Sequence, residues 1–184
     1  MSDKIEFLAV KGVKTFMGTD APGYNATLMV NGKKAAEFVN DGGGGETRFR
    51  WSDPEAEKLF GAYVESLPLV DYGSIAGYNP QLIKPSDDCV VEELVERHLE
   101  RKKILRLIGQ RKLVWKTNTC RDSQYLVSRV PAASPAVLAA QVQEIKDNNA
   151  GDDKLMVANE DAEAFLDALG FFRHPRKEQH GLQS

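Results

Sequence analysis

The sequence has few of the residues that mark secreted, membrane-spanning or metal-binding proteins. Its 184 residues include two cysteines, Cys89 and Cys120, which are too few for a disulfide framework and fit a reducing cytosol. No segment approaches the ~18 consecutive apolar residues that cross a bilayer, and residues 1–5 lack the start of a signal peptide. The three histidines complete no H-E-x-x-H motif. These absences lead us to expect a cytoplasmic protein with no cofactor and no membrane contact.

Nothing in the motifs argues for an enzyme. C-x-x-C, G-x-S-x-G and EF-hand spacings are all missing. His98 lies beside the apolar side of a predicted long helix, where we expect a partly buried structural imidazole, with metal binding or acid–base work as the alternative. No base partner can be assigned to Cys120, so we expect plain free thiols at both cysteines. The sequence predicts no catalytic residue and no metal site.

The first fifty residues are typical of an antiparallel β-meander. The dipeptide Asn31-Gly32 separates residues 26–30 from residues 33–39 and supplies the two positive-φ positions of a type I′ hairpin turn. An apolar first strand precedes this hairpin. Residues 47–51 then alternate polar and aromatic side chains, which predicts an edge strand.

Helical signals follow the meander. Either Ser52 or Asp53 is expected to cap a helix at Pro54, and Ser52 and Glu55 have the spacing of a capping box. The helix is expected to end at Pro68. A second, longer amphipathic helix is predicted from Asp88 to Ile108. The apolar stripe of the first helix, expected to pack on the sheet, comprises Ala56, Leu59, Phe60, Tyr63, Val64 and Leu67.

The last third of the sequence predicts a hairpin, two helices and a strand. Residues 112–116 and 124–130 form the hairpin, and residues 154–158 form the strand. Ser134 caps the first helix and Asn159 caps the second. The residues of the first helix that we expect to face inward are Val137, Leu138, Val142 and Ile145.

Strands that come in hairpins favour the α+β class, with an N-terminal antiparallel β-meander packed by helices. We expect one composite domain, with a split near residues 68–87 as the alternative. Within it, residues 1–67 form the meander plus helix, and residues 68–87 form an irregular connection. Residues 88–172 form the helix, hairpin, helix, strand and helix, and residues 173–184 form a polar tail.

The charge of the chain is unevenly distributed. Its 24 Lys and Arg against 27 Asp and Glu give a net charge of −3, which excludes a uniformly basic nucleic-acid coat. Residues 97–121 nevertheless hold nine basic residues against Glu100 alone, a local charge of +8. Such a segment suits a phosphate backbone or an acidic protein surface, with a solvated helix face as the alternative. The residues predicted to bind a partner are Arg97, Arg101, Lys102, Lys103, Arg106, Arg111, Lys112, Trp115 and Lys116.

A second candidate site is the glycine-rich loop from Gly42 to Gly45. Four consecutive glycines let backbone amides approach a phosphate closely, and Arg48 and Arg50 follow at once. The loop lacks the Lys-Ser/Thr pair of a P-loop, and no helix begins directly after it. A flexible hairpin loop is therefore the alternative. The possible phosphate-binding residues are Gly42, Gly43, Gly44, Gly45, Arg48 and Arg50.

The N-terminal motif carries a resemblance. The run from Tyr24 to Gly45, YNATLMVNGKKAAEFVNDGGGG, resembles the opening of small phage and prophage proteins with the hairpin pattern ATLxxNGKKxAxxxNDGxGG. That family also has a later Lys/Arg-rich helix leading into a short strand, to which residues 101–115 are similar. Glu46-Thr47 stand where that family has polar or aromatic residues after the pattern.

The resemblance covers about half of the chain and implies a phage accessory context, with no catalytic residues to carry over. Small phage accessory proteins often bind host machinery or host defence, and inhibitors of CRISPR effectors belong to that class. Our first hypothesis is a non-enzymatic protein that binds a host or defence complex, or its nucleic acid, through the basic segment. The alternatives are a nucleotide or cyclic-nucleotide binder that uses the glycine loop, and a structural or assembly protein of a phage.

Overall fold

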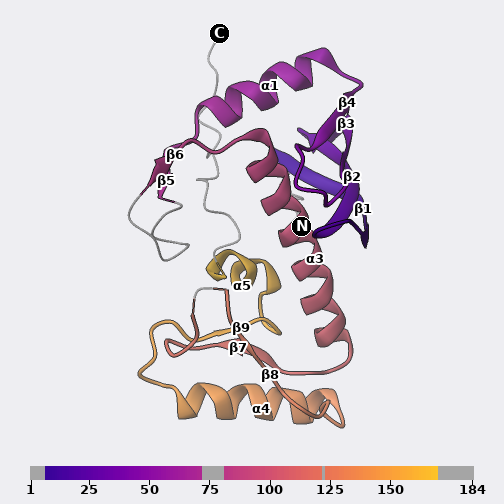
Figure 1. Ribbon diagram of the computed structural model, residues 1–184. Coiled ribbons are helices and arrows are strands. Elements are labelled where there is room, and N and C mark those ends of the chain that lie inside the picture. Colours follow the sequence, from indigo (N-terminus) through magenta and orange to yellow (C-terminus); the bar gives the residue numbers. More distant parts are fainter. Residues whose placement is uncertain (1–6, 72–80, 122, 170–184) are drawn as a thin grey trace. The chain divides into compact units, whose positions relative to one another are not determined.

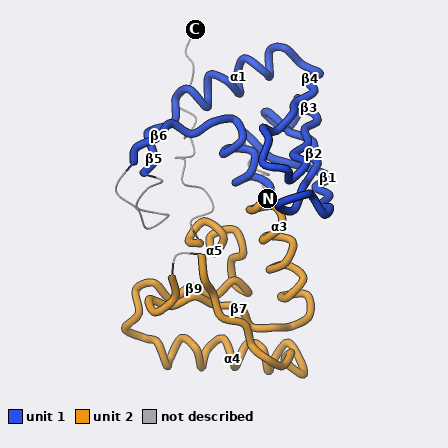
Figure 2. The backbone as a smooth tube through the Cα atoms, viewed as in Figure 1, with its two compact units in different colours: residues 1–95, 173–184 blue, residues 96–172 orange. Residues whose placement is uncertain are grey.

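A computed structural model describes residues 7–71, 81–121 and 123–169, and it has the α+β architecture that the sequence predicts (Figure 1). The described chain divides into two compact units inside helix α3 (Asp87–Gly109): unit 1 ends at Val95 and unit 2 begins at Glu96 (Figure 2). The division lies outside residues 68–87, where we placed the alternative split. The predicted polar tail, residues 173–184, lies outside the described residues.

Unit 1 is built on the predicted β-meander. Strands β1 (Leu8–Met17), β2 (Pro22–Val30), β3 (Lys33–Asn40) and β4 (Arg48–Trp51) pair antiparallel in the order β1-β2-β3-β4. Asn31 has φ 49° and Gly32 has φ 76°, as a type I′ turn requires. The meander, its hairpin turn and the edge position of β4 are therefore confirmed.

Strand β1 lies at the other edge of this sheet and is interrupted by a β-bulge. Its pairing with β2 shifts register between Lys11 and Lys14, and Gly12 has φ +64°. Both lysines and Gly12 are exposed. The bulge therefore divides a strand of ten residues into two shorter paired stretches.

One face of the sheet is apolar and packs against helix α1 (Pro54–Glu65). Phe49 and Trp51 of β4 lie with their rings 6.0 Å and 5.6 Å from the ring of Phe60. The opposite face carries Glu37 and Arg50, which are paired across β3 and β4 and exposed. The predicted stripe of α1 is buried apart from Leu59, which is 45% exposed.

Helix α1 begins with one of the two predicted caps. Asp53, and not Ser52, is the N-cap, and its carboxylate accepts from the amides of Glu55 and Ala56. The Ser52 hydroxyl instead donates to the carbonyl oxygen of Ala35 at 2.9 Å. Ser52 therefore ties the start of the helix to β3, and the predicted capping box with Glu55 is wrong.

The connection 68–87 contains more regular structure than we expected. Strands β5 (Val70–Asp71) and β6 (Leu82–Ile83) pair antiparallel near its two ends. Residues 72–80 lie outside the described residues. Helix α3 follows, and its length confirms the long helix predicted from Asp88 to Ile108.

Unit 2 contains a three-stranded sheet between helices. Strands β7 (Val114–Lys116), β8 (Leu126–Val127) and β9 (Met156–Val157) pair antiparallel in the order β8-β7-β9. Helix α5 (Ala162–Ala168) covers one face of the sheet, and helix α4 (Pro135–Asn148) lies along the other (Figure 1). The core cluster of unit 2 comprises Ile104, Val114, Ala158, Phe165, Leu166 and Leu169.

Two predictions for unit 2 need correction. Helix α4 starts at the predicted Ser134 cap, and of the four residues expected to face inward Leu138, Val142 and Ile145 are half-buried, whereas Val137 is 41% exposed. The cap of α5 is Asp161 rather than Asn159. Asn159 instead accepts from the amide of Val114 and donates to the carbonyl oxygen of Lys112. The Asn159 side chain thus makes hydrogen bonds to the backbone next to and within β7 that a neighbouring strand would otherwise make.

The length and apolar character of a helix decide whether it can cross a membrane. Within residues 7–71, 81–121 and 123–169, no helix combines the length and apolar character needed to cross a bilayer.

The glycine-rich loop is part of the packing at one end of the unit 1 sheet. The Gly42 carbonyl oxygen accepts from the amides of Asp20 and Ala21 at 2.9 Å and 2.8 Å. Gly42 has φ +70°, and a Cβ there would lie 2.1 Å from the Ala21 carbonyl oxygen. A Cβ on Gly18 would lie 2.5 Å from the Asp41 carbonyl oxygen. Close backbone contact between the two loops therefore requires glycine at both positions.

Three alanine substitutions separate the roles of the glycines. Gly42→Ala combines a positive φ with a backbone clash and is expected to lower the free energy of unfolding by about 3 kcal/mol or more. Gly44→Ala, where φ is +75° with nothing within 4 Å, should cost about 1 kcal/mol. Gly45 has neither a positive φ nor a neighbour within 4 Å, so Gly45→Ala should leave the free energy of unfolding nearly unchanged. Urea unfolding measures all three, and equal costs would contradict this assignment.

Candidate functional site

Two of the predicted partner-binding residues lie inside unit 2. Arg97 on α3 is 5% exposed, and its guanidinium lies 2.8 Å from Asp167 Oδ1 and 3.4 Å from Glu163 Oε2, both on α5. Lys116 is 7% exposed and donates its ammonium to the carbonyl oxygen of Ala168 at 3.0 Å. The expectation that Arg97 and Lys116 line a binding surface is therefore corrected, because groups at α5 take up both charges.

Two further cations of the segment have acidic partners at the surface. Arg101 Nε lies 2.5 Å from Glu163 Oε1, and Lys103 Nζ lies 3.0 Å from Glu100 Oε1. Glu100 also accepts from the hydroxyl of Tyr125, over whose ring Lys103 lies at 5.1 Å from the centroid. The ion pairs neutralise Arg101 and Lys103 in part but leave their side chains about half exposed.

The outward side of α3 carries the cations that remain. His98, Lys102 and Arg106 follow at i+4 spacing, so their side chains form one line along the helix, which we call the α3 ridge; Gln110 follows just beyond the end of the helix. Lys102 and Arg106 are exposed, and neither forms an ion pair within the described part of the chain. Like charges at this spacing cost about 0.2–0.5 kcal/mol. The ridge is thus mildly destabilising for the isolated protein.

His98 begins the ridge and responds to its charge. Its side chain is partly buried, and burial lowers the pKa of the imidazole first, with Lys102 and Arg101 lowering it further. The ring is therefore held neutral at pH 7. This agrees with the partly buried imidazole that the sequence predicts.

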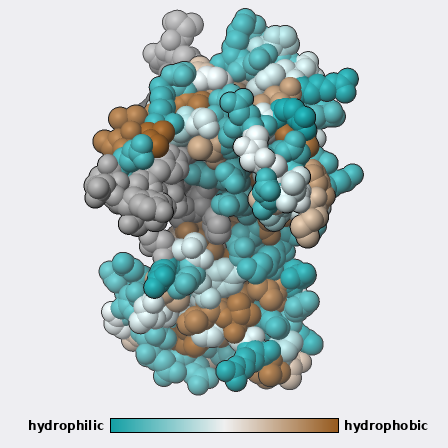
Figure 3. All heavy atoms as spheres, viewed as in Figure 1, coloured by the Kyte–Doolittle hydropathy of each residue, from teal (hydrophilic) through white to brown (hydrophobic). Residues whose placement is uncertain are grey.

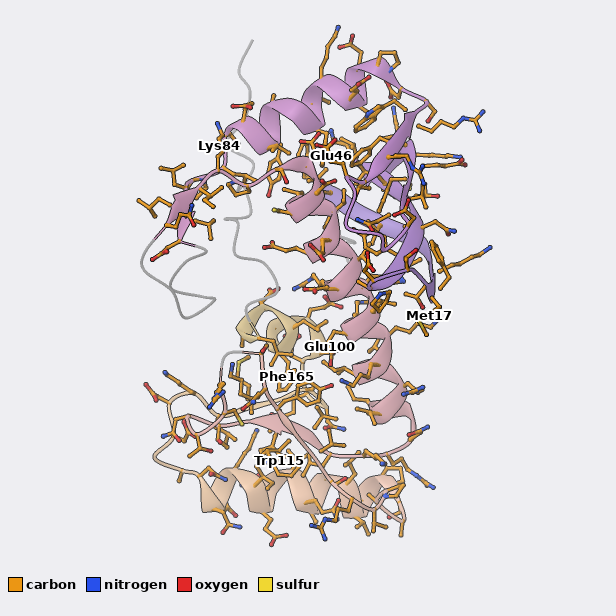
Figure 4. The ribbon with its side chains drawn as sticks, in the orientation of Figure 1. Met17, Glu46, Lys84, Glu100, Trp115 and Phe165 are labelled. Carbon is orange, nitrogen blue, oxygen red and sulfur yellow. The ribbon has the colours of Figure 1, made fainter. Side chains whose placement is uncertain are left out.

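The residues after α3 do not extend this line. Arg111 ends the helix with φ 58° and donates to the carbonyl oxygen of Ala133 at 3.2 Å. Lys112 is half-buried. Trp115 alternates with the inward Val114 and Lys116, so it faces α4, as Figure 4 shows. The structure therefore does not bring Trp115 to the ridge.

The glycine loop offers few free phosphate-binding groups. The amide of Gly42 donates to Asn40 Oδ1 at 2.9 Å, and that of Gly43 donates to Asp41 Oδ1 at 3.0 Å. Arg48 pairs with Asp41 at 3.1 Å. Arg50 lies opposite Glu37, whose pKa is lowered by Lys34 and then by Arg50. A Cβ on Gly44 or Gly45 would meet nothing within 4 Å. Asp41 thus takes up both the Gly43 amide and the Arg48 guanidinium.

Sequence reasoning missed a hollow of about 570 Å³ beside β8. It is lined by Lys103 of α3 and by polar and apolar residues of the segment that ends in β8. No periodicity could have revealed it, because β8 has two residues and the lining comes from a loop and a helix. The lining residues are Lys103, Thr119, Cys120, Ser123, Gln124, Tyr125, Leu126 and Val127.

The two arginines of α3 that reach α5 are expected to differ in their effect on stability. Arg97→Ala removes a buried cation from two carboxylates and should lower the free energy of unfolding by about 3 kcal/mol. Arg101→Ala removes a half-exposed pair and should cost less than about 1 kcal/mol. Urea denaturation of both variants checks the difference, and a cost for Arg97→Ala no greater than that for Arg101→Ala would refute it.

The lowered pKa of His98 makes stability fall in acid. Protonation favours the unfolded chain, whose imidazole has the higher pKa, so this contribution is absent well above pH 6.5 and grows as pH falls below it. The free energy of unfolding of the wild type should decline more between pH 7.5 and pH 5.5 than that of His98→Gln. Parallel pH profiles from urea unfolding would rule out the effect.

Neither a metal group nor a relative adds to this picture. No set of three or more His, Cys, Asp and Glu side chains that could hold a metal ion occurs among the residues that the structure describes. Comparison of the chain with protein-family models, curated proteins and solved structures finds no match. The exposed ridge of α3 and the hollow beside it are therefore the features on which a functional interpretation rests.

Proposed function

We propose that this protein is a non-enzymatic phage or prophage accessory protein that binds an acidic surface of a host or defence complex through the α3 ridge. The observation that carries the proposal is the exposure of Lys102 and Arg106 on one line, without ion-pair partners in the described chain. Arg97, Arg101 and Lys103 all have carboxylate partners. A carboxylate-rich partner surface would relieve the repulsion between Lys102 and Arg106.

The number of free cations favours a protein partner over nucleic acid. A protein that grips DNA typically makes about 6–10 phosphate contacts. Ion pairs and burial leave few unpaired cations on the ridge, and Trp115 faces α4 instead of offering a stacking surface.

The phage context rests on the resemblance of residues 24–45 to phage and prophage proteins. In this chain, the Asn31-Gly32 turn sets the register of β2 and β3, and Gly42 packs against Ala21. The residues of this motif therefore have a structural role within unit 1. The amides of Gly42 and Gly43 have side-chain partners, so the nucleotide-binding alternative gains no supporting observation, and neither does an assembly role.

Charge reversal on the ridge tests the proposal. The bait is the tagged full chain in a lysate of an infected bacterial host, treated with nuclease. The variant Lys102→Glu/Arg106→Glu is expected to lose about tenfold or more of the captured protein partner, because attraction becomes repulsion at both positions. Lys11→Glu/Lys14→Glu is the matched control, since it changes the net charge equally at exposed positions of β1 and should capture normally.

Circular dichroism confirms that each variant is folded before capture is compared. Equal capture by the ridge variant and the control would overturn the proposal. Capture that disappears on nuclease treatment would show that nucleic acid, and not an acidic protein surface, occupies the ridge.

A further inference from the structure

Strand β8 has one edge bonded to β7 and one edge open. The amide of Ser128 donates to the Leu113 carbonyl oxygen at 2.9 Å, next to the paired residues Val114 and Val127. Antiparallel pairs alternate between those that exchange hydrogen bonds and those whose backbone groups point away from each other. The N–H and C=O of Val127 therefore point away from β7.

The partner residue on β7 confirms this alternation. Val114 accepts from the Ala158 amide at 2.9 Å and donates to Asn159 Oδ1 at 2.9 Å, so its own backbone groups point toward β9. Val127 must then point the opposite way. Its amide and carbonyl have no hydrogen-bond partner within the described part of the chain.

The open edge of β8 forms a wall of the hollow beside it. Leu126 is 43% exposed there, and hydrophobic side chains gather on the visible face of unit 2 over β7 and β8, between α5 and α4 (Figure 3). Lys103, Thr119 and Ser123 add a cation and two hydroxyls. An edge strand, an apolar surface and a cation therefore meet in one hollow.

We propose that an extended acidic segment of the partner adds to β8 as a further strand, with a carboxylate of that segment bound by Lys103. The inference rests on the proposed function and identifies how that partner is held. Main-chain bonds to Val127 would provide affinity, and alternate side chains would reach Leu126 or the polar groups of the hollow.

The charge around the hollow is what selects an acidic segment. The Lys103 ammonium has three N–H donors, and its hydrogen bonds with Glu100 and Tyr125 leave one donor for a ligand. Glu100 is bound by both Tyr125 and Lys103, which offsets its repulsion of a carboxylate. Lys103 precedes Arg106 by about one helical turn. An acidic segment bound by Lys103 would therefore also lie near Arg106 of the ridge.

A synthetic peptide tests strand addition directly. The probe is a fluorescent octapeptide of alternating glutamate and valine, and binding to the full chain is measured by fluorescence anisotropy. Methylation of the backbone nitrogens along one edge of the peptide should weaken binding about tenfold, because the peptide can then no longer donate to β8. A peptide of alternating lysine and valine should bind about fivefold more weakly or worse.

Substitutions in β8 provide the complementary test. Val127→Pro removes the outward N–H and leaves the amides of Leu126 and Ser128, which serve the β7 side, so it should weaken binding about tenfold. Val127→Thr keeps the amide and is the matched control. Lys103→Glu should weaken binding of the acidic peptide about fivefold, and hydrogen exchange of the Val127 amide should slow when the peptide binds.

The outcomes separate this inference from the proposed function. Failure of the peptide to bind at 1 mM, or equal binding of the methylated peptide, would overturn strand addition even if the ridge variant loses its partner. The methylated peptide needs no variant, so a Val127→Pro protein that fails to fold does not weaken the test. Strand addition without loss of capture by Lys102→Glu/Arg106→Glu would overturn the role of the ridge alone.

Discussion

The contact between the guanidinium of Arg97 and the carboxylates of α5 decides which charges of unit 2 remain for a partner. Arg97 lies 66 residues before Glu163 and is almost fully buried, so its charge is stable only with Glu163 and Asp167 beside it. Glu163 also holds Arg101. Because α5 is anchored at this point, Phe165, Leu166 and Leu169 can fill the core of unit 2; Phe165 is labelled in Figure 4.

The two most conspicuous features of the sequence have mainly structural roles. Glu163 and Asp167 of α5 pair with two cations of the basic segment, Arg97 and Arg101. The glycine run allows the backbone at Gly42 to approach Ala21 closely. What remains for recognition is smaller than the sequence suggests: one line of exposed cations and the hollow beside β8.

Local signals predicted the elements of this fold well, and long-range contacts account for what they missed. Asn31-Gly32 specifies its hairpin because both residues tolerate positive φ, and the apolar stripe of α1 has the helical period. The choice of Asp53 over Ser52 as cap depends on Ala35, which is distant in sequence. Likewise, burial of Arg97 depends on α5, and the side chain of Asn159 is used by β7. These partners lie far away in the sequence, so a pattern of neighbouring residues cannot reveal them.

The bulge in β1 has a consequence for the behaviour of the protein in a crowded cell. A regular edge strand of ten residues is a template on which other chains can nucleate aggregates. The bulge at Gly12 breaks the even spacing of its amides, and Lys11 and Lys14 add charge that an incoming strand must desolvate. An edge strand interrupted and charged in this way is a poorer template for pairing with another chain than a regular strand of the same length.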